Sequence, residues 1–139
     1  MTKTQETIKK YINRYRKIYK TLKPTYCPAL KAQINFTSEG FNHLIFKNGH
    51  RRSNKQIKNR LPLISLIIPT LKKCKSSSKV QVMDETYKSR LITVMYFELA
   101  HIVGKKRPVK IKIIIKKRGS LGNLFFLSAM KQKTPKKRR

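Results

Sequence analysis

Residues 108–118, which read PVKIKIIIKKR, carry the clearest structural pattern in the chain. Side chains alternate between the two faces of a β-strand, so four apolar side chains share one face of this stretch: Val109, Ile111, Ile113 and Ile115. The other face carries Ile114 and four cations: Lys110, Lys112, Lys116 and Arg118. Neighbouring positions on that face are about 6–7 Å apart, close to the spacing of phosphates on a single nucleic-acid strand. The pattern predicts a strand with one face in a core and the other against a polyanion.

The stretches around this strand repeat its two-residue period. Residues 80–83, 90–101 and 124–130 are predicted as strands, and the intervening turns fall at 104–107 and at 119–123, which reads GSLGN. Consecutive strands joined by short turns indicate an antiparallel meander.

The first half of the chain repeats apolar side chains every three or four residues, as amphipathic helices do. Residues 4–22 are predicted as a helix with one basic face. Residues 32–36 form a strand-like run, and Thr37 or Ser38 can then cap a second helix that contains His43. Helices followed by strands predict an α+β fold, with N-terminal helices packed on one face of a four-stranded antiparallel β-sheet.

A third helix and the two chain ends complete the expected organisation. Ser53 followed by Gln56 forms a capping box that opens the third helix. The predicted segments are 1–30, a basic amphipathic helix with a linker, then 31–130, the α+β domain, and 131–139, a disordered basic tail.

The charge of the chain restricts its partners. Thirty-five Lys and Arg residues against five Asp and Glu residues give a formal net charge of +30 over 139 residues. Such self-repulsion weakens the compact state unless a counter-charge is usually present. A nucleic acid is the first candidate for that counter-charge, and an anionic membrane surface is the second.

The apolar segments and the cysteines indicate a cytoplasmic protein. The longest apolar run, 61–71, is too short to span a membrane and contains two prolines. The N-terminus has no apolar signal core. Cys27 and Cys74 lack the spacing of zinc ligands, and we expect ordinary thiols in a reducing compartment.

The few carboxylates exclude whole classes of reaction. A two-metal nuclease needs several carboxylates converging on its ions, and only five are present, so we expect no metal ion and no other cofactor. The chain also lacks the glycine-rich loop of nucleotide hydrolases. RNA cleavage by attack of the 2′-hydroxyl needs only a base, an acid and cations. The histidines are His43, His50 and His101, and the first precedes a cluster of arginines.

Several of these residues have simpler interpretations. His43 lies among apolar residues and could be a half-buried structural histidine. The stretch from His50 to Arg52 could be a solvated basic loop. Tyr96 and Glu98 share a strand face, where they could orient a histidine, read a base or simply pack. Ser128 could be an edge hydroxyl or, beside Lys112 and Lys116, a phosphate ligand.

The order of the short motifs resembles one known group of proteins. The segments INFTSEGFNHLI, HRRSNKQIKNRL, YFEL, VKIKIIIKKRG and FFLSAM, within residues 32–130, resemble the phage and mobile-element branch of the barnase–EndoU–colicin–RelE-like nuclease superfamily. The resemblance implies helices before a four-stranded antiparallel sheet, with metal-independent RNA cleavage on the open face. It also implies RNA as substrate, including tRNA or rRNA, and an immunity or antitoxin protein as partner.

Individual positions follow this resemblance. The helix histidine matches His43, the basic-serine motif matches Arg52-Ser53, the arginine before leucine matches Arg60, and the hydroxyl of the last strand matches Ser128. The strand before the GSLGN turn departs from the pattern, because it ends in three cations, at 116–118, where relatives often end in one arginine.

The leading hypothesis from the sequence is an endoribonuclease of the toxin or mobile-element type. Its predicted catalytic residues are His43, His50, Arg52, Arg60, Lys112 and Ser128, and its predicted nucleic-acid contacts are Arg51, Lys110, Lys116 and Arg118. One alternative is a non-catalytic, ribosome-associated module that binds RNA or DNA. Another is a protein that contacts a membrane surface or a partner through the helix at 4–22.

Overall fold

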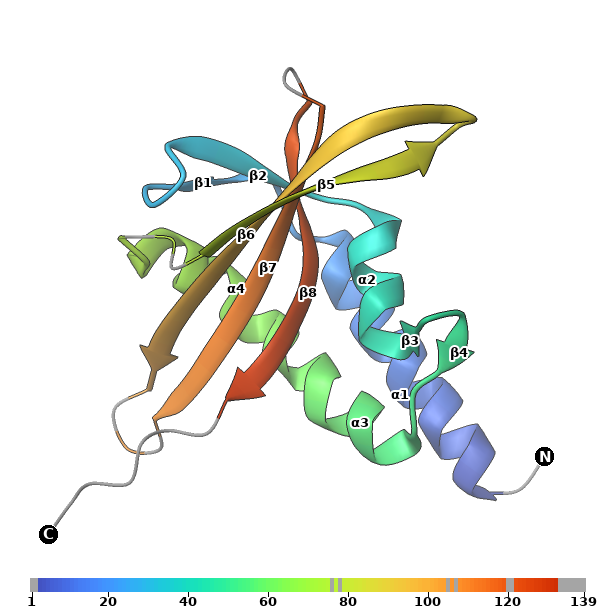
Figure 1. Ribbon diagram of the computed structural model, residues 1–139. Coiled ribbons are helices and arrows are strands. Elements are labelled where there is room, and N and C mark those ends of the chain that lie inside the picture. Colours follow the sequence, from blue (N-terminus) through green and yellow to red (C-terminus); the bar gives the residue numbers. More distant parts are fainter. Residues whose placement is uncertain are drawn as a thin grey trace, which may run out of the picture.

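A computed structural model describes residues 3–75, 77, 79–104, 106, 108–119 and 122–132 (Figure 1). The elements in chain order are α1 (Lys3–Lys20), β1 (Thr25–Cys27), β2 (Ala32–Phe36), α2 (Ser38–Ile45), β3 (Phe46–Lys47), β4 (His50–Arg51), α3 (Asn54–Arg60), the 3-10 helix η1 (Leu61–Leu63), α4 (Ile64–Lys73), β5 (Lys79–Tyr87), β6 (Arg90–Val103), β7 (Val109–Arg118) and β8 (Leu124–Gln132).

The main sheet has six strands in the order β1-β2-β8-β7-β6-β5. All neighbouring strands are antiparallel except β2 and β8, which run parallel. Helix α4 covers one face of the sheet, against β6 and β7, and α2 runs beside β8 (Figure 1). We call the opposite face the open face.

The structure confirms an α+β fold with a mostly antiparallel sheet, but the expected strand count and element order are wrong. The four predicted strands are β5 to β8, with β5 longer than expected. The sheet gains β1 and β2, which lie between α1 and α2 in the sequence. Pairing of β2 with β8 joins Ile34 to Leu124, and such a distant partner leaves no local pattern in the sequence.

The hydrophobic core lies between the sheet and the helices. Ile111, Ile113 and Ile115 of β7 are fully buried, as the alternation predicts. Ile8 and Tyr19 of α1 are buried in the same core, so α1 packs against the other elements of the fold. The predicted tail at 131–139 begins within β8, and residues 133–139 lie outside the described part of the chain.

Helix α2 is held close to the sheet by a glycine. A Cβ atom on Gly40 would overlap the carbonyl oxygen of Phe126 on β8 and lie 2.7 Å from the Tyr19 hydroxyl. That hydroxyl donates a hydrogen bond to the carbonyl of Thr37, at 2.6 Å, just before α2. The predicted cap of α3 is present, since Ser53 Oγ accepts from the backbone N–H of Gln56 at 3.2 Å. Gly40 and the Tyr19 hydroxyl thus fix the position of α2 against β8, whereas the Ser53 cap stabilises only the start of α3.

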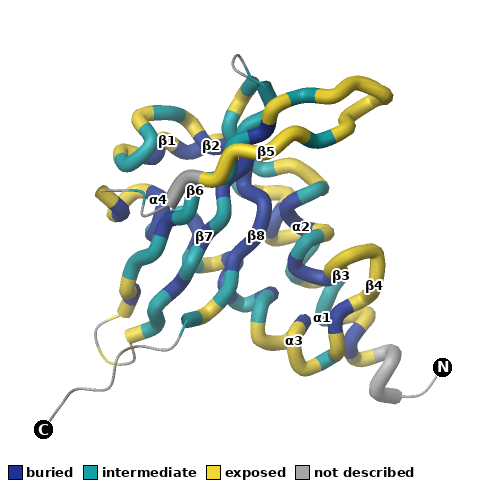
Figure 2. The backbone as a smooth tube through the Cα atoms, viewed as in Figure 1, coloured by how far each residue is buried: buried dark blue, intermediate teal, exposed yellow. Residues whose placement is uncertain are grey.

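Exposure is uneven across the sheet (Figure 2). The middle of β7 and β8 is buried, whereas much of the β5–β6 hairpin is exposed, including the apolar Val82 and Leu91. None of the helices in the described part of the chain has the length and apolar character needed to cross a membrane.

Candidate functional site

The open face brings together side chains from three neighbouring strands. Tyr96 of β6 lies opposite Lys116 of β7, and Ser128 of β8 lies opposite Ile114. Because alternate residues of a strand share a face, Lys112, Lys116 and Ser128 belong to one surface. This confirms the predicted separation of the cations of β7 from its buried isoleucines.

Lys116 lies at the centre of a compact charged group, which we call the Lys116 cluster: Lys116, Arg118, Glu39, Glu85 and Tyr96. Its Nζ atom is 2.7 Å from Glu85 Oε1 and 3.6 Å from Glu39 Oε1. The Tyr96 hydroxyl donates to the second oxygen of Glu85 at 2.9 Å. Lys116 is only 4% exposed, so its charge depends on these carboxylates rather than on water.

The pKa values of the cluster reflect this pairing. The hydrogen bond from Lys116 lowers the pKa of Glu85, while partial burial opposes that shift. Burial by itself would lower the pKa of Lys116, but the hydrogen bond to Glu85 and the nearby negative charges outweigh it, and the pKa is raised. Lys116 therefore stays charged and is a stabilising cation rather than a proton donor.

Arg118 closes the other side of the Lys116 cluster. One of its terminal nitrogens lies 2.7 and 2.9 Å from the two oxygens of Glu39. Its guanidinium also lies over the rings of Tyr87, at 4.3 Å, and Phe125, at 4.9 Å. These contacts fix the guanidinium plane and hold Glu39 against β7.

His43 lies one helical turn after Glu39 on α2, so both side chains share a helix face. Burial lowers the pKa of His43; the charge of Glu39 opposes this shift, and the positive charges of Lys116, Arg52 and Arg60 add to it. The imidazole is therefore neutral at neutral pH and can accept a proton. It lines a shallow hollow of about 350 Å³ together with Glu39, Phe46 and the turn of the β3–β4 hairpin. We call this the His43 hollow.

Arg60 connects the end of α3 to β8. Its guanidinium donates to the carbonyl of Ala129 at 3.2 Å and to Ser128 Oγ at 3.4 Å. Burial lowers its pKa, and the neighbouring charge of Arg52 adds to that effect. The last strand, α2 and α3 thus bring His43, Arg60, Ser128 and Lys116 into one region.

The other predicted site residues lie elsewhere or have structural partners. Arg52 is 7% exposed, and its Nε donates to the backbone carbonyl of His43 at 3.0 Å, so it fixes the end of α2. Lys112 forms an ion pair of 2.6 Å with Glu98. Lys110 lies opposite Ile102 and Gln132, near the N-terminal end of β7 and away from the Lys116 cluster.

The predicted residues of the β3–β4 hairpin are exposed. His50 pairs with Lys47 across this hairpin, and Arg51 donates to the side chain of Asn54 at 2.9 Å. Neither residue belongs to the Lys116 cluster as the structure describes it.

Sequence reasoning missed Glu39 and Glu85 as members of the site. The spacing of Glu39 and His43, four residues apart on one helix face, was a readable signal. Glu85 has no such signal, because it reaches Lys116 across the twisted β5–β6 hairpin. The face expected to be uniformly cationic is thus partly neutralised, since Lys112, Lys116 and Arg118 all face carboxylates.

Among the described residues, no three His, Cys, Asp or Glu side chains are grouped so that they could hold a metal ion. No protein-family model matches the chain, and neither a curated protein nor a solved structure matches it.

Proposed function

We propose that the protein is an endoribonuclease that cleaves RNA by attack of the 2′-hydroxyl on the adjacent phosphate, without a metal ion. The observation that carries the proposal is a half-buried histidine on α2 whose pKa is lowered by the charges of Lys116, Arg52 and Arg60, with Arg60 bonded to the Ser128 hydroxyl. These groups supply the base and the cations of the reaction, since the histidine can accept the 2′ proton and the cations can stabilise a phosphorane. As the bond from phosphorus to the 5′ oxygen breaks, a water molecule protonates that leaving oxygen.

The structure suggests a role for each residue. His43 removes the 2′ proton, because burial and the nearby cations keep its imidazole unprotonated at neutral pH. Arg60, already aimed at Ser128, contacts the phosphate with its fixed donors, and the Ser128 hydroxyl orients an oxygen of that phosphate. Lys116 remains charged and stabilises the transition state from the sheet.

The carboxylates of the Lys116 cluster give the site a second property. Glu39 and Glu85 already neutralise Lys116 and Arg118, so β7 offers less free positive charge to RNA than its sequence suggests. Attraction of the substrate must then come largely from the basic surface outside the cluster. RNA, such as tRNA or rRNA in the cytoplasm, remains the proposed substrate.

The second candidate function is a non-catalytic module that binds RNA or DNA. The observation that favours it is the pairing of Lys116 with Glu85, because an ion pair that only stabilises the fold also perturbs pKa values. Such a module would bind RNA with a steep salt dependence and leave the RNA intact.

The two functions differ in one experiment. The purified protein is incubated with total RNA in EDTA, and the products are tested for 2′,3′-cyclic phosphate ends. We expect cleavage by the parent protein and a loss of at least about a hundredfold in His43→Ala, because general base catalysis contributes about 10²–10⁴-fold. The control is His101→Gln, on β6. Equal cleavage by His43→Ala and the parent would remove His43 from the mechanism, and intact RNA would favour the binding module.

A further inference from the structure

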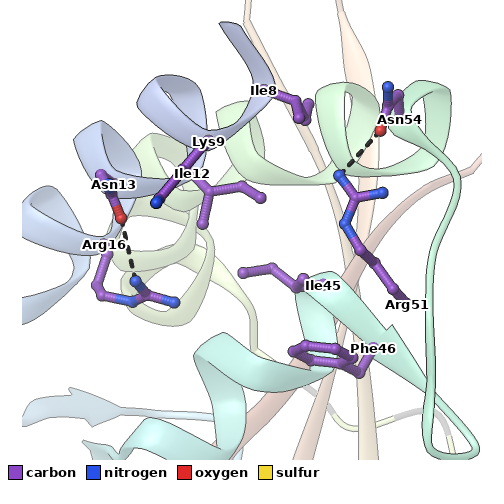
Figure 3. A pocket seen from close by; sticks show the side chains of 9 residues that line it. All are labelled: Ile8, Lys9, Ile12, Asn13, Arg16, Ile45, Phe46, Arg51 and Asn54. Carbon is purple, nitrogen blue, oxygen red and sulfur yellow. Dashed lines mark hydrogen bonds between the residues drawn. The ribbon is translucent and has the colours of Figure 1, made fainter. Parts of the chain in front are cut away.

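A cavity of about 590 Å³ lies between α1 and the β3–β4 hairpin (Figure 3). Residues from α1, from the end of α2 and its continuation into β3, and from the start of α3 line it. Its volume falls within the range of about 300–1,000 Å³ that is typical of small-ligand sites. We call it the α1 cavity.

The walls of the α1 cavity combine an apolar floor with a cationic rim. Ile8, Ile12 and Ile45 provide the floor, and two of them are buried in the core. Phe46 stands at the edge with 44% of its surface exposed. The rim carries three cations, Lys9 and Arg16 on the α1 side and Arg51 on the side of β4 (Figure 3). This combination suits a ligand with a flat apolar part and an attached anion.

The rim cations differ from those of β7 in the groups that they face. Arg16 donates to the side-chain amide oxygen of Asn13 at 3.1 Å, and Arg51 donates to that of Asn54 at 2.9 Å. An amide is neutral, so these bonds orient the guanidinium groups without cancelling their charge. In the described part of the chain, neither arginine forms an ion pair with a carboxylate. The rim therefore keeps its attraction for an anion.

Phe46 connects this cavity to the candidate active site. The same ring lines the α1 cavity and the His43 hollow. A strand of RNA with one phosphate at His43 would therefore continue past Phe46 towards the rim of the α1 cavity. A base has a flat π-face that stacks on an exposed aromatic ring, and its phosphates suit arginine donors.

We propose that the α1 cavity is a nucleotide-binding subsite for single-stranded RNA, which rests on the proposed ribonuclease function of the adjoining His43 hollow. The base of a nucleotide next to the cleaved phosphate stacks on Phe46 over the apolar floor. The flanking phosphates contact Arg16 and Arg51. The subsite thus positions the substrate and supplies the positive charge that the Lys116 cluster has neutralised.

Binding is measured by fluorescence anisotropy with a labelled 12-nucleotide 2′-O-methyl RNA of mixed sequence, which lacks the attacking hydroxyl and cannot be cleaved. We expect Phe46→Ala to raise the dissociation constant on the order of tenfold, because stacking of one base on an aromatic ring contributes about that much. The matched control is Tyr26→Ala, an exposed aromatic side chain on β1 that we expect to leave binding unchanged. Circular dichroism checks that each variant is folded.

The charges of the rim give a second readout. Arg51→Gln should weaken binding and reduce the slope of log affinity against log salt concentration by about 0.7, the value for one phosphate contact on a single strand. Lys72→Gln, an exposed cation at the end of α4, serves as the charge-matched control. A slope change that is equal in both variants would mean that Arg51 acts only through the net charge of the protein, and this would overturn its role.

Cleavage assays separate failure of the subsite from failure of the ribonuclease proposal. With an active enzyme, Phe46→Ala should raise KM for RNA far more than it lowers kcat, because the lost stacking contact holds substrate and transition state alike. If the parent cleaves nothing and Phe46→Ala still loses RNA affinity, the binding site stands without the enzyme. If Phe46→Ala binds RNA as the parent does, the subsite is wrong whatever the activity. Binding to anionic phospholipid vesicles that depends on Phe46, with RNA affinity unchanged, would assign the cavity to a membrane instead.

Discussion

Removal of Glu85 should destabilise the protein more than removal of the lysine that it pairs with. Lys116 is nearly buried and its Nζ atom faces Glu85 at 2.7 Å and Glu39 at 3.6 Å. At an effective permittivity of about 20, these distances correspond to gross attractions of about 6 and about 5 kcal/mol. Glu85→Gln therefore removes roughly half of the compensation of a charge that water scarcely reaches.

The net cost is smaller than the gross attraction. Stripping the partner from a buried ion typically costs about 3–5 kcal/mol, but Glu39 remains and the Glu85 side chain is 33% exposed. We expect Glu85→Gln to lower the free energy of unfolding by about 2 kcal/mol. Lys116→Met removes the buried charge itself and leaves two partly exposed carboxylates that water can solvate. That variant should cost at most about 1 kcal/mol.

Urea unfolding followed by circular dichroism at pH 7 measures both values, with equal m-values as the test that the unfolding transition is unchanged. The control is Asp84→Asn, an exposed carboxylate on the same hairpin, for which we expect a change of less than about 0.5 kcal/mol. A larger loss of unfolding free energy in Lys116→Met than in Glu85→Gln would contradict the role of Glu85. A loss in Glu85→Gln no larger than that in Asp84→Asn would contradict it as well.

Three further predictions concern packing and protonation. Gly40→Ala should lower the free energy of unfolding by about 1–3 kcal/mol in urea titrations, because the added Cβ overlaps the backbone of β8; an unchanged midpoint would contradict this close packing. The pKa of Glu85 is lowered in the folded state, so its stabilising contribution is present above pH 4.5 and is lost as the pH falls through the folded pKa. Glu85→Gln should therefore show a shallower acid-induced loss of stability than the parent, and parallel curves would refute the linkage. Arg60→Gln should raise the pKa of His43 in an NMR titration of the imidazole, and Glu39→Gln should lower it, because the two charges act in opposite directions; a shift of either in the reverse direction would contradict the assigned electrostatics.

Local patterns in the sequence were enough to predict most of the longer helices and strands, and the apolar and polar face of each. The alternation in β7 identified Ile111, Ile113 and Ile115 as core residues, and all three are buried. Asn48 and Gly49, residue types that favour turns, join β3 to β4 with positive φ, and the cap at Ser53 forms as its motif predicts. These features depend on residues that are close in the chain, so local periodicity and turn chemistry are sufficient to predict them.

Contacts between residues far apart in the chain depend on the packing of the whole fold. Two short strands joined the sheet through the parallel pairing of β2 with β8, and Glu85 reached Lys116 from 31 residues away. Arg60 similarly met Ser128 across 68 residues. Periodicity tells which face a cation occupies, but it does not tell which carboxylate the twist and packing of the sheet place against it. The sequence therefore predicted a surface of free cations on β7, whereas the fold pairs three of them with carboxylates. Arg16 and Arg51, on the rim of the α1 cavity, face neutral side-chain amides instead.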